Sequence, residues 1–370
     1  MIIETLFFWI LAVTTIGVIF IQLLQWRGLR STPGNKSDQI HSFSIIIAAR
    51  NEEKNISRLL DSFSQLDYPK EKFEIIIVDD RSTDSTKLIA EKFTARLSNL
   101  KIISILKNET DMPHKKNALR AGIANARFDI LAFTDADCVV PKQWLKKLSE
   151  QFTDDVGAVA GYSPFQLPDR NRLFPSFLRY EELKGSLYAA AAINNGTPYM
   201  CTGRNFAYRK KVYDEVGGFE KIKHSVSGDD DLFLQLVSRE TSWKVRYMTD
   251  YDSYILTVPP TTVAAFVNQR TRHISASKYY DPKMKILLGL FHLHLLIFLV
   301  GLFVTPLWSI IFFLVRINAD AVIIAQGKKI LNEEFTVTEF FRNELLLICY
   351  TIVIGPMGFI KKYDWKGAAA

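Results

Sequence analysis

Long uncharged stretches lie at both ends of the chain and are absent from its middle. Thr5 to Trp26 contains no charged residue, and about 20 apolar residues in a helix cross a hydrocarbon layer roughly 30 Å thick. The start of the chain lacks the positive charge and the small-residue cleavage site of a signal peptide. We therefore predict a retained transmembrane anchor over residues 1–27, followed by a polar linker over residues 28–42 that is rich in Ser, Gly, Asn and Lys.

Between the two apolar ends, β-branched runs alternate with helical patterns. The runs at 44–47 and 74–78 are apolar without alternation, which is typical of strands covered by helices on both faces. Strands alternating with helices indicate parallel βαβ units. We predict an α/β, Rossmann-like domain with a mostly parallel central sheet. Strands are predicted at 43–48, 73–78, 101–106, 129–134 and 156–162, and helices at 54–65, 85–93, 116–126 and 143–152.

The second apolar region begins at about residue 281. Its uncharged run from Ile286 to Val315 would be about 45 Å long as a straight helix, which exceeds one bilayer crossing. Pro306 predicts a break, giving a hairpin whose second helix continues toward Ile324. The last run, 345–360, is short for a span, and the sequence leaves open whether it crosses, re-enters or lies flat. Residues 281–370 are therefore predicted to form a C-terminal membrane region with two or three hydrophobic helices.

The distribution of charge predicts an orientation in the membrane. Arg27, Arg30 and Lys36 follow the first apolar run, whereas only Glu4 precedes it. The positive-inside rule then places the central domain in the cytoplasm, with Lys361 and Lys362 on the same side. We expect a multi-pass membrane protein of the bacterial inner-membrane type.

Composition excludes two classes of function. The net charge of +7 comes with no basic run or aromatic-interleaved patch, so membrane lipids rather than nucleic acid are the expected partner. The three cysteines, Cys138, Cys201 and Cys349, are widely spaced and form no CxxC pair, so neither a zinc site nor a redox site is predicted.

Acidic residues follow several predicted strands at their carboxyl ends. Asp135 and Asp137 come directly after the strand at 129–134, and residues i and i+2 of an extended segment share a face. Two such carboxylates can hold Mg²⁺ or Mn²⁺ and leave positions for diphosphate oxygens. Glu52 and the pair Asp79 and Asp80 follow two other strands. Because open α/β sheets bind ligands at this edge, a nucleotide site is expected there.

Five segments resemble glycosyltransferase family 2, the inverting enzymes with the GT-A fold, over roughly Phe43 to Tyr280. The resemblance implies a GT-A domain over residues 43–280 and a sugar transferred from a nucleotide-sugar donor, expected to be UDP-linked. It also implies a divalent metal, Mg or Mn, and a lipid-linked or cell-envelope glycan acceptor. The segments are Ser44–Glu53, Ile77–Asp84, the Asp135 and Asp137 pair, Gly228–Leu232 and Gln269–Arg272.

The resemblance also implies roles for individual residues. The metal would lie on Asp135 and Asp137, and Gly203 and Asn205 would line the acceptor side. The general base that takes the proton of the acceptor hydroxyl would be Asp229, with Asp230 as the alternative. An acidic helix N-terminus, favoured by the helix dipole, explains at least one of these neighbouring aspartates equally well. The predicted donor-binding residues are Glu52, Asp79, Asp80, Lys115, Asp135, Gln269, Arg270 and Arg272.

Two alternatives to single sugar transfer remain at this stage. One is a processive polysaccharide synthase, although His273 stands where the QxxRW box of the family has the tryptophan that stacks on a growing polymer. The other is a non-catalytic membrane scaffold that uses the domain to bind nucleotides. His292 and His294 lie in the second apolar region at positions i and i+2, which do not share a helix face, so they predict no metal pair. One of them is expected to face the bundle interior or a lipid-linked substrate.

Overall fold

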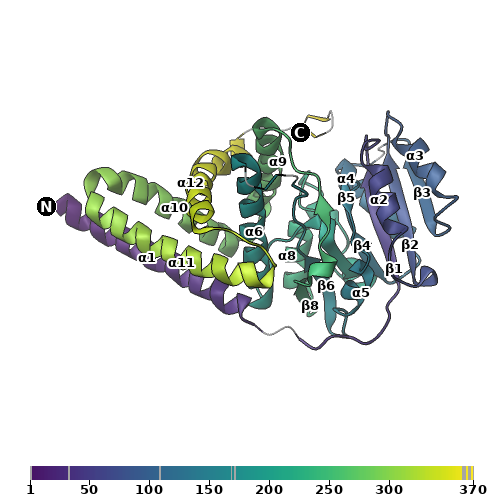
Figure 1. Cartoon of the computed structure of the whole chain (residues 1–370), viewed down its shortest axis with the longest axis horizontal. Helices are drawn as coiled ribbons and strands as arrows, with labels where there is room; N and C mark the ends of the chain where they lie inside the picture. Colours follow the sequence, from purple (N-terminus) through teal and green to yellow (C-terminus); the bar gives the residue numbers. More distant parts are fainter. Residues whose placement is uncertain are drawn as a thin grey trace.

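The computed structural model describes residues 2–31, 34–107, 110–167, 169–170 and 172–360, and the backbone of 364–365 and 368–369, which form the short strands β10 (Asp364–Trp365) and β11 (Ala368–Ala369). Lys361 and Lys362, for which a cytoplasmic position is expected, lie outside the described residues. The chain has two parts that lie side by side, an α/β sheet layer and a group of long helices (Figure 1).

A seven-stranded sheet with the order β3-β2-β1-β4-β7-β6-β8 forms the centre of the first part. All neighbouring pairs are parallel except those made by β7, which is antiparallel to both β4 and β6. The predicted α/β class with a mostly parallel sheet is therefore confirmed. The strands are β1 (Phe43–Ala49), β2 (Phe73–Asp80), β3 (Leu100–Ile105), β4 (Ile130–Phe133), β6 (Val156–Gly161), β7 (Phe206–Arg209) and β8 (Lys244–Met248), and a separate pair joins β5 (Cys138–Val139) to β9 (Leu256–Thr257).

Helices cover both faces of this sheet, as the unbroken apolar runs predict. Ile45 and Ile47 of β1 belong to a core that includes α2 and α5, whereas Ile46 belongs to a core that includes α4 and α8. Because consecutive side chains of a strand point to opposite faces, a run of isoleucines fills both cores. The helices of this part are α2 (Ile56–Phe63), α3 (Thr86–Phe93), α4 (His114–Ala124), α5 (Trp144–Ser149), α7 (Lys210–Glu215), α8 (Asp231–Glu240) and α9 (Val263–Ser275).

Four helices of the described residues are long and apolar enough to cross a membrane, by length and composition. They are α1 (Ile2–Leu29), α10 (Pro282–Val304), α11 (Pro306–Ile330) and α12 (Val337–Ile360), and α1 packs along α10 and α11 (Figure 1). The predicted break at Pro306 is confirmed, because α10 ends at Val304 and α11 begins at Pro306. The last apolar run, 345–360, is the second part of α12, a helix of 24 residues. The helix is longer than the run because it begins at Val337 and includes charged residues before the run.

The sequence did not predict the long helix α6 (Leu173–Asn194), which lies between the sheet and the four apolar helices (Figure 1). Its polar residues are buried as well as its apolar ones, so it lacks the one-sided pattern that marks a surface helix. Lys184 forms ion pairs with Glu344 of α12 and, at 3.1 Å, with Asp320 of α11. Removing either partner of a buried pair is costly, so these contacts fix the apolar helices against the domain that carries the site.

Candidate active site

A cavity of about 1020 Å³ opens at the carboxyl ends of β1 and β4 and extends along α6 and α9 to α10 and α12. The chain turns from β1 to β2 on one side and to β4 on the other, so this edge is the topological switch point where open α/β sheets bind ligands. Most of the predicted site residues line it. They are Glu52, Asp80, Lys115, Asp135, Asp137, Gly203, Asp229, Asp230, Gln269, Arg270 and Arg272.

Two strained backbone positions shape the rim of the cavity. Asn51 follows β1 with φ 54° and Arg81 follows β2 with φ 56°, a region that residues other than glycine rarely adopt. The backbone N–H of Asn51 donates to Ser82 Oγ at 3.0 Å, and Asn51 Oδ1 accepts from the Thr83 N–H at 2.9 Å. These bonds tie together the loops that follow β1 and β2, next to Glu52 and Asp80, which both line the cavity.

Lys115, in the first turn of α4, links two acidic parts of the cavity. Its Nζ lies 3.2 Å from Asp135 Oδ1 and 3.1 Å from Asp229 Oδ2. Burial alone would lower the pKa of Lys115, but these carboxylates outweigh it and raise the pKa. The candidate metal ligand and the candidate base are therefore held by one cation.

Asp135 and Asp137 both line the cavity and offer the carboxylate oxygens that Mg²⁺ and Mn²⁺ prefer. Within the described ranges, no group of three or more His, Cys, Asp or Glu side chains is arranged to hold a metal ion. This donor set fits a Mg²⁺-type ion that keeps water or substrate phosphate as its other ligands rather than one enclosed entirely by protein.

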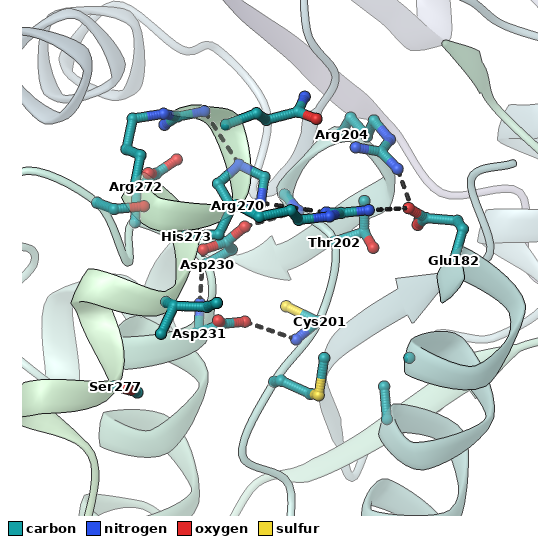
Figure 2. Close-up of a pocket in the computed structure, with 18 of the residues that line it drawn as sticks. Glu182, Cys201, Thr202, Arg204, Asp230, Asp231, Arg270, Arg272, His273 and Ser277 are labelled. Carbon is teal, nitrogen blue, oxygen red and sulfur yellow. Dashed lines mark hydrogen bonds and ion pairs between the residues drawn. The ribbon is translucent and has the colours of Figure 1, made fainter. Parts of the chain in front are cut away.

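The three neighbouring aspartates before and in α8 have different surroundings. Asp230 accepts hydrogen bonds from the backbone N–H of Gly203 at 3.0 Å and of Asp231 at 2.8 Å, so it caps the helix. Asp231 accepts from the Cys201 N–H at 2.9 Å (Figure 2). It also accepts from the Tyr280 hydroxyl at 2.6 Å. Asp229 instead faces Lys115, so it is the aspartate whose carboxylate is directed to the charged part of the cavity.

The pKa values also distinguish Asp229 from Asp230 and Asp231. Burial raises the pKa of Asp229, but Lys115 and Lys116 outweigh burial and lower it below the usual value. Burial and the charge of Asp229 raise the pKa of Asp230, and burial raises that of Asp231 well above the usual value. Asp229 is thus ionised over the widest range of pH.

Lys116 is a residue of the site that sequence reasoning missed. It is buried, and its Nζ donates to the backbone carbonyls of Ser225 and, at 2.7 Å, of Ser227. These bonds hold the segment that leads to Asp229. The sequence shows Lys116 only as the neighbour of Lys115 at a helix start, where most lysines are exposed.

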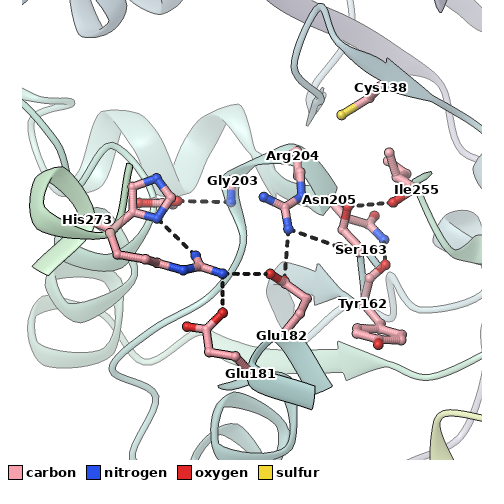
Figure 3. Close-up of polar contacts among 12 residues, drawn as sticks. Cys138, Tyr162, Ser163, Glu181, Glu182, Gly203, Arg204, Asn205, Ile255 and His273 are labelled. Atoms are coloured by element: carbon pink, nitrogen blue, oxygen red, sulfur yellow. Dashed lines mark hydrogen bonds and ion pairs between the residues drawn. The ribbon is translucent and has the colours of Figure 1, made fainter. Parts of the chain in front are cut away.

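The segment Gln269–Arg272 lies on α9 and lines the cavity, but its two arginines differ. Arg270 forms an ion pair with Glu181 of α6 and lies 3.4 Å from Glu182. Glu182 also accepts from Arg204 at 2.8 Å (Figure 3). Arg270 is therefore neutralised by α6 in this structure. For Arg272, no carboxylate partner occurs among the described residues, and it contacts His273 at 3.0 Å.

Two predicted residues are not brought to the cavity. Asn205 is buried, its Oδ1 accepts from Trp144 Nε1 at 3.1 Å, and its Nδ2 donates to the carbonyls of Tyr162 and Ser253 (Figure 3). These bonds join the segment to the sheet, and Asn205 does not line the cavity, whereas Gly203, the other residue predicted for the acceptor side, does. Asp79 lies behind Asp80, because consecutive residues of β2 face opposite ways.

The chain matches known proteins over the domain that carries this cavity. The family model for glycosyl transferase family 2 matches residues 44–217. The glycosyltransferase AglE of Haloferax volcanii is 30% identical over 188 residues, which are 50% of this chain and 58% of that protein. A beta-monoglucosyldiacylglycerol synthase of a Synechocystis species is 26% identical over 234 residues, 62% of this chain and 46% of that one. The chain therefore spans about half the length of these curated relatives.

A solved structure shares the fold. The mannosyltransferase PcManGT of Pyrobaculum calidifontis, in complex with GDP-Man and Mn²⁺, superimposes with a TM-score of 0.58 at 18% identity, and the match covers 95% of this chain and 99% of that one.

Proposed function

We propose that this chain, which belongs to glycosyl transferase family 2, is a membrane-bound inverting glycosyltransferase. It moves a sugar from a nucleotide-sugar donor, expected to be UDP-linked, to a lipid-linked or cell-envelope glycan acceptor. The observation that carries the proposal is the contact of Lys115 with both Asp135 and Asp229, because Asp135 is the proposed metal ligand and Asp229 the proposed base.

Donor binding is assigned to the edge formed by β1, β2 and β4. Asp80 Oδ2 and Gln269 Oε1 are buried, and neither has a hydrogen-bond partner among the described residues. An unpaired buried acceptor is unfavourable, so both suit an N–H or hydroxyl donor of a nucleoside or sugar. Asp135 and Asp137 would hold the divalent ion, which when bound neutralises the charge of the leaving diphosphate.

Asp229 is proposed as the general base. The acceptor hydroxyl oxygen forms a bond to the anomeric carbon while the bond from that carbon to the diphosphate breaks, and the hydroxyl proton moves to the Asp229 carboxylate. The low pKa of Asp229 keeps it ionised and able to accept at neutral pH. Asp230 is assigned a positioning role, since it holds the backbone of Gly203 and caps α8.

Membrane association supports an acceptor in or near the bilayer. Four helices of the described residues have the length and composition of membrane spans. Arg27 in the last turn of α1, with Arg30 and Lys36 after it, favours a cytoplasmic domain. The name of the Synechocystis relative describes glucosylation of a diacylglycerol, a membrane lipid. His273 in place of a stacking tryptophan favours single transfer over processive synthesis.

The proposed function is tested by incubating the purified chain in lipid with a panel of UDP-linked and GDP-linked sugars and a membrane-lipid extract. We expect release of the nucleoside diphosphate with one donor, and a loss on the order of 100-fold or more when EDTA removes the metal, because the leaving group then lacks its counter-charge. Adding Mn²⁺ back should restore the rate. Nucleotide binding without turnover of any donor would identify a non-catalytic scaffold instead.

Gly228 gives a further test, because its conformation sets the position of Asp229. Its φ is +85°, and an added Cβ would lie 2.6 Å from Leu232 Cγ, so Gly228→Ala is strained and overpacked. We expect transfer to fall by about tenfold or more, since small misplacements of catalytic groups are costly. Gly217→Ala is the matched control, because Gly217 has φ +78° but nothing within 4 Å of an added Cβ. Equal activities of the two variants would contradict this role.

A further inference from the structure

The cavity extends past the candidate donor site into a space between α10 and α12, which we call the membrane-side chamber. Its wall is formed by Leu288, Gly289 and His292 of α10 and by Tyr350, Gly355 and Phe359 of α12. Both helices have the length and composition of membrane spans. One continuous space therefore joins the nucleotide edge of the sheet to helices that are expected to lie in lipid.

The acidic residues that line this cavity come from an earlier part of the sequence than its last four cationic residues. All the carboxylates that line it come from residues 52–231, including Asp135, Asp229 and Glu182. From Gln269 onward, the charged lining residues are cationic, namely Arg270, Arg272, Lys278 and Lys285. Arg270 is neutralised by Glu181, whereas within the described part of the chain no carboxylate forms an ion pair with Arg272, Lys278 or Lys285. Arg272, Lys278 and Lys285 are thus cations of the cavity lining, carried by the segments that lead from α9 into α10, and none of them has a carboxylate partner in the described part of the chain.

We propose that the membrane-side chamber binds the acceptor as an amphipathic lipid with an anionic, phosphate-bearing head group. The head lies against Arg272, Lys278 and Lys285, because phosphate oxygens form strong charge-assisted hydrogen bonds with such groups. The apolar chain lies between α10 and α12. This inference rests on the proposed function for the reaction, but the lipid site itself is a separate property.

The packing of the two helices leaves room for the lipid at one level and closes at another. An added Cβ on Gly289 would meet nothing within 4 Å, so the wall is open there. An added Cβ on Gly355 would lie 2.6 Å from His292 Nε2, so α10 and α12 touch at that level. His292 Nδ1 donates to the Leu288 carbonyl at 2.9 Å, which leaves Nε2 of the neutral ring as an acceptor. His294, in contrast, is buried against Thr14 of α1.

The test uses native mass spectrometry of the full chain in detergent, with dioleoyl phosphatidic acid and dioleoylglycerol as probes. We expect retention of the phosphatidic acid, with Gly289→Phe lowering its retention about tenfold because the ring fills the open part of the chamber. Leu293→Phe is the steric control, since Leu293 is 50% exposed on α10 and does not line the cavity. Retention of dioleoylglycerol equal to that of phosphatidic acid would overturn the anionic head group.

The charge contacts are tested with the double substitution Lys278→Gln and Lys285→Gln, which should lower retention about tenfold. Lys283→Gln is the control for the single variant Lys285→Gln, because Lys283 is exposed on α10 two residues before Lys285 but does not line the cavity. An equal loss in this control would mean attraction to surface charge only and would overturn the site. Displacement of the lipid by a soluble phosphorylated glycan, with no preference for a chain, would assign a glycan acceptor instead.

Binding of UDP by the same variants separates this inference from the proposed function. Gly289→Phe should bind UDP as the unsubstituted chain does, since Gly289 lies outside the nucleotide edge. Lipid retention without turnover of any nucleotide sugar would overturn the proposed function and support the lipid site. Turnover of a nucleotide sugar that Gly289→Phe leaves unchanged, with no lipid retained, would overturn the lipid site and support the proposed function.

Discussion

Asp229→Asn is expected to lower the rate of sugar transfer by about 10²–10⁴-fold, the usual contribution of a general base, while donor binding persists. Asparagine has nearly the same shape but cannot take the acceptor proton. Lys115 keeps its contact with Asp135 at 3.2 Å, so the change should not leave a buried cation without a partner. The measurement is kcat and KM for the donor, together with the temperature of unfolding.

Asp230→Asn is the control that distinguishes the two candidate bases, Asp229 and Asp230. Its two carboxylate oxygens accept from the backbone N–H groups of Gly203 and Asp231, and an amide would direct an NH₂ group at one of these donors. We therefore expect a lower temperature of unfolding, by a few degrees for about 1–2 kcal/mol. A folded Asp230→Asn chain without transfer, beside an active Asp229→Asn chain, would make Asp230 the base.

Replacing Asp135 and Asp137 together with asparagine is expected to abolish metal-dependent transfer, with a loss of about 100-fold or more at saturating donor. Both side chains line the cavity, and a neutral amide is a weaker ligand for Mg²⁺ or Mn²⁺ than a carboxylate. The single variants should need higher Mn²⁺ concentrations for half-maximal rate, which a metal titration measures directly.

Asp154→Asn serves as the control for the metal experiment. Asp154 is exposed just before β6, at the opposite edge of the sheet from the cavity, so its loss removes one negative charge without touching the site. Its metal titration should match that of the unsubstituted chain. A double variant of Asp135 and Asp137 with an unchanged response to Mn²⁺ would show that the ion binds elsewhere or is not used.

The strands and their acidic ends could be predicted from the sequence because both depend on local pattern. An uninterrupted apolar run such as Ile45–Ala49 must be buried on both faces, which requires helices above and below a parallel sheet. Ligand-binding residues then follow the strand ends, and Glu52, Asp80, Asp135 and Asp137 do line the cavity. The hairpin at Pro306 could also be predicted from a local signal, because proline cannot continue a helix across that position.

The elements that the sequence missed are those whose pattern is set by distant partners. The helix α6 buries the charged residues Lys184 and Glu182, which interrupt the apolar pattern expected of a buried helix. In the structure Lys184 is paired with Glu344 and Glu182 with Arg204. The same ion pair explains why α12 begins before the apolar run at Leu345, since Glu344 is buried against Lys184. Charged residues look exposed in a sequence, and only packing shows that they are paired.

By itself the sequence determined the fold class, the family resemblance, the apolar helices and most of the polar residues that line the cavity at the strand ends, since each of these follows from short-range spacing. Only the tertiary structure decided how these residues are used: Lys115 joins Asp135 to Asp229, Arg270 is neutralised by α6, and Asn205 is withdrawn from the cavity. The physical reason is that the strength of a charge or a hydrogen bond depends on the groups within a few ångströms of it. Folding brings those groups together from segments far apart in the chain, as it does where α10 and α12 continue the wall of the site.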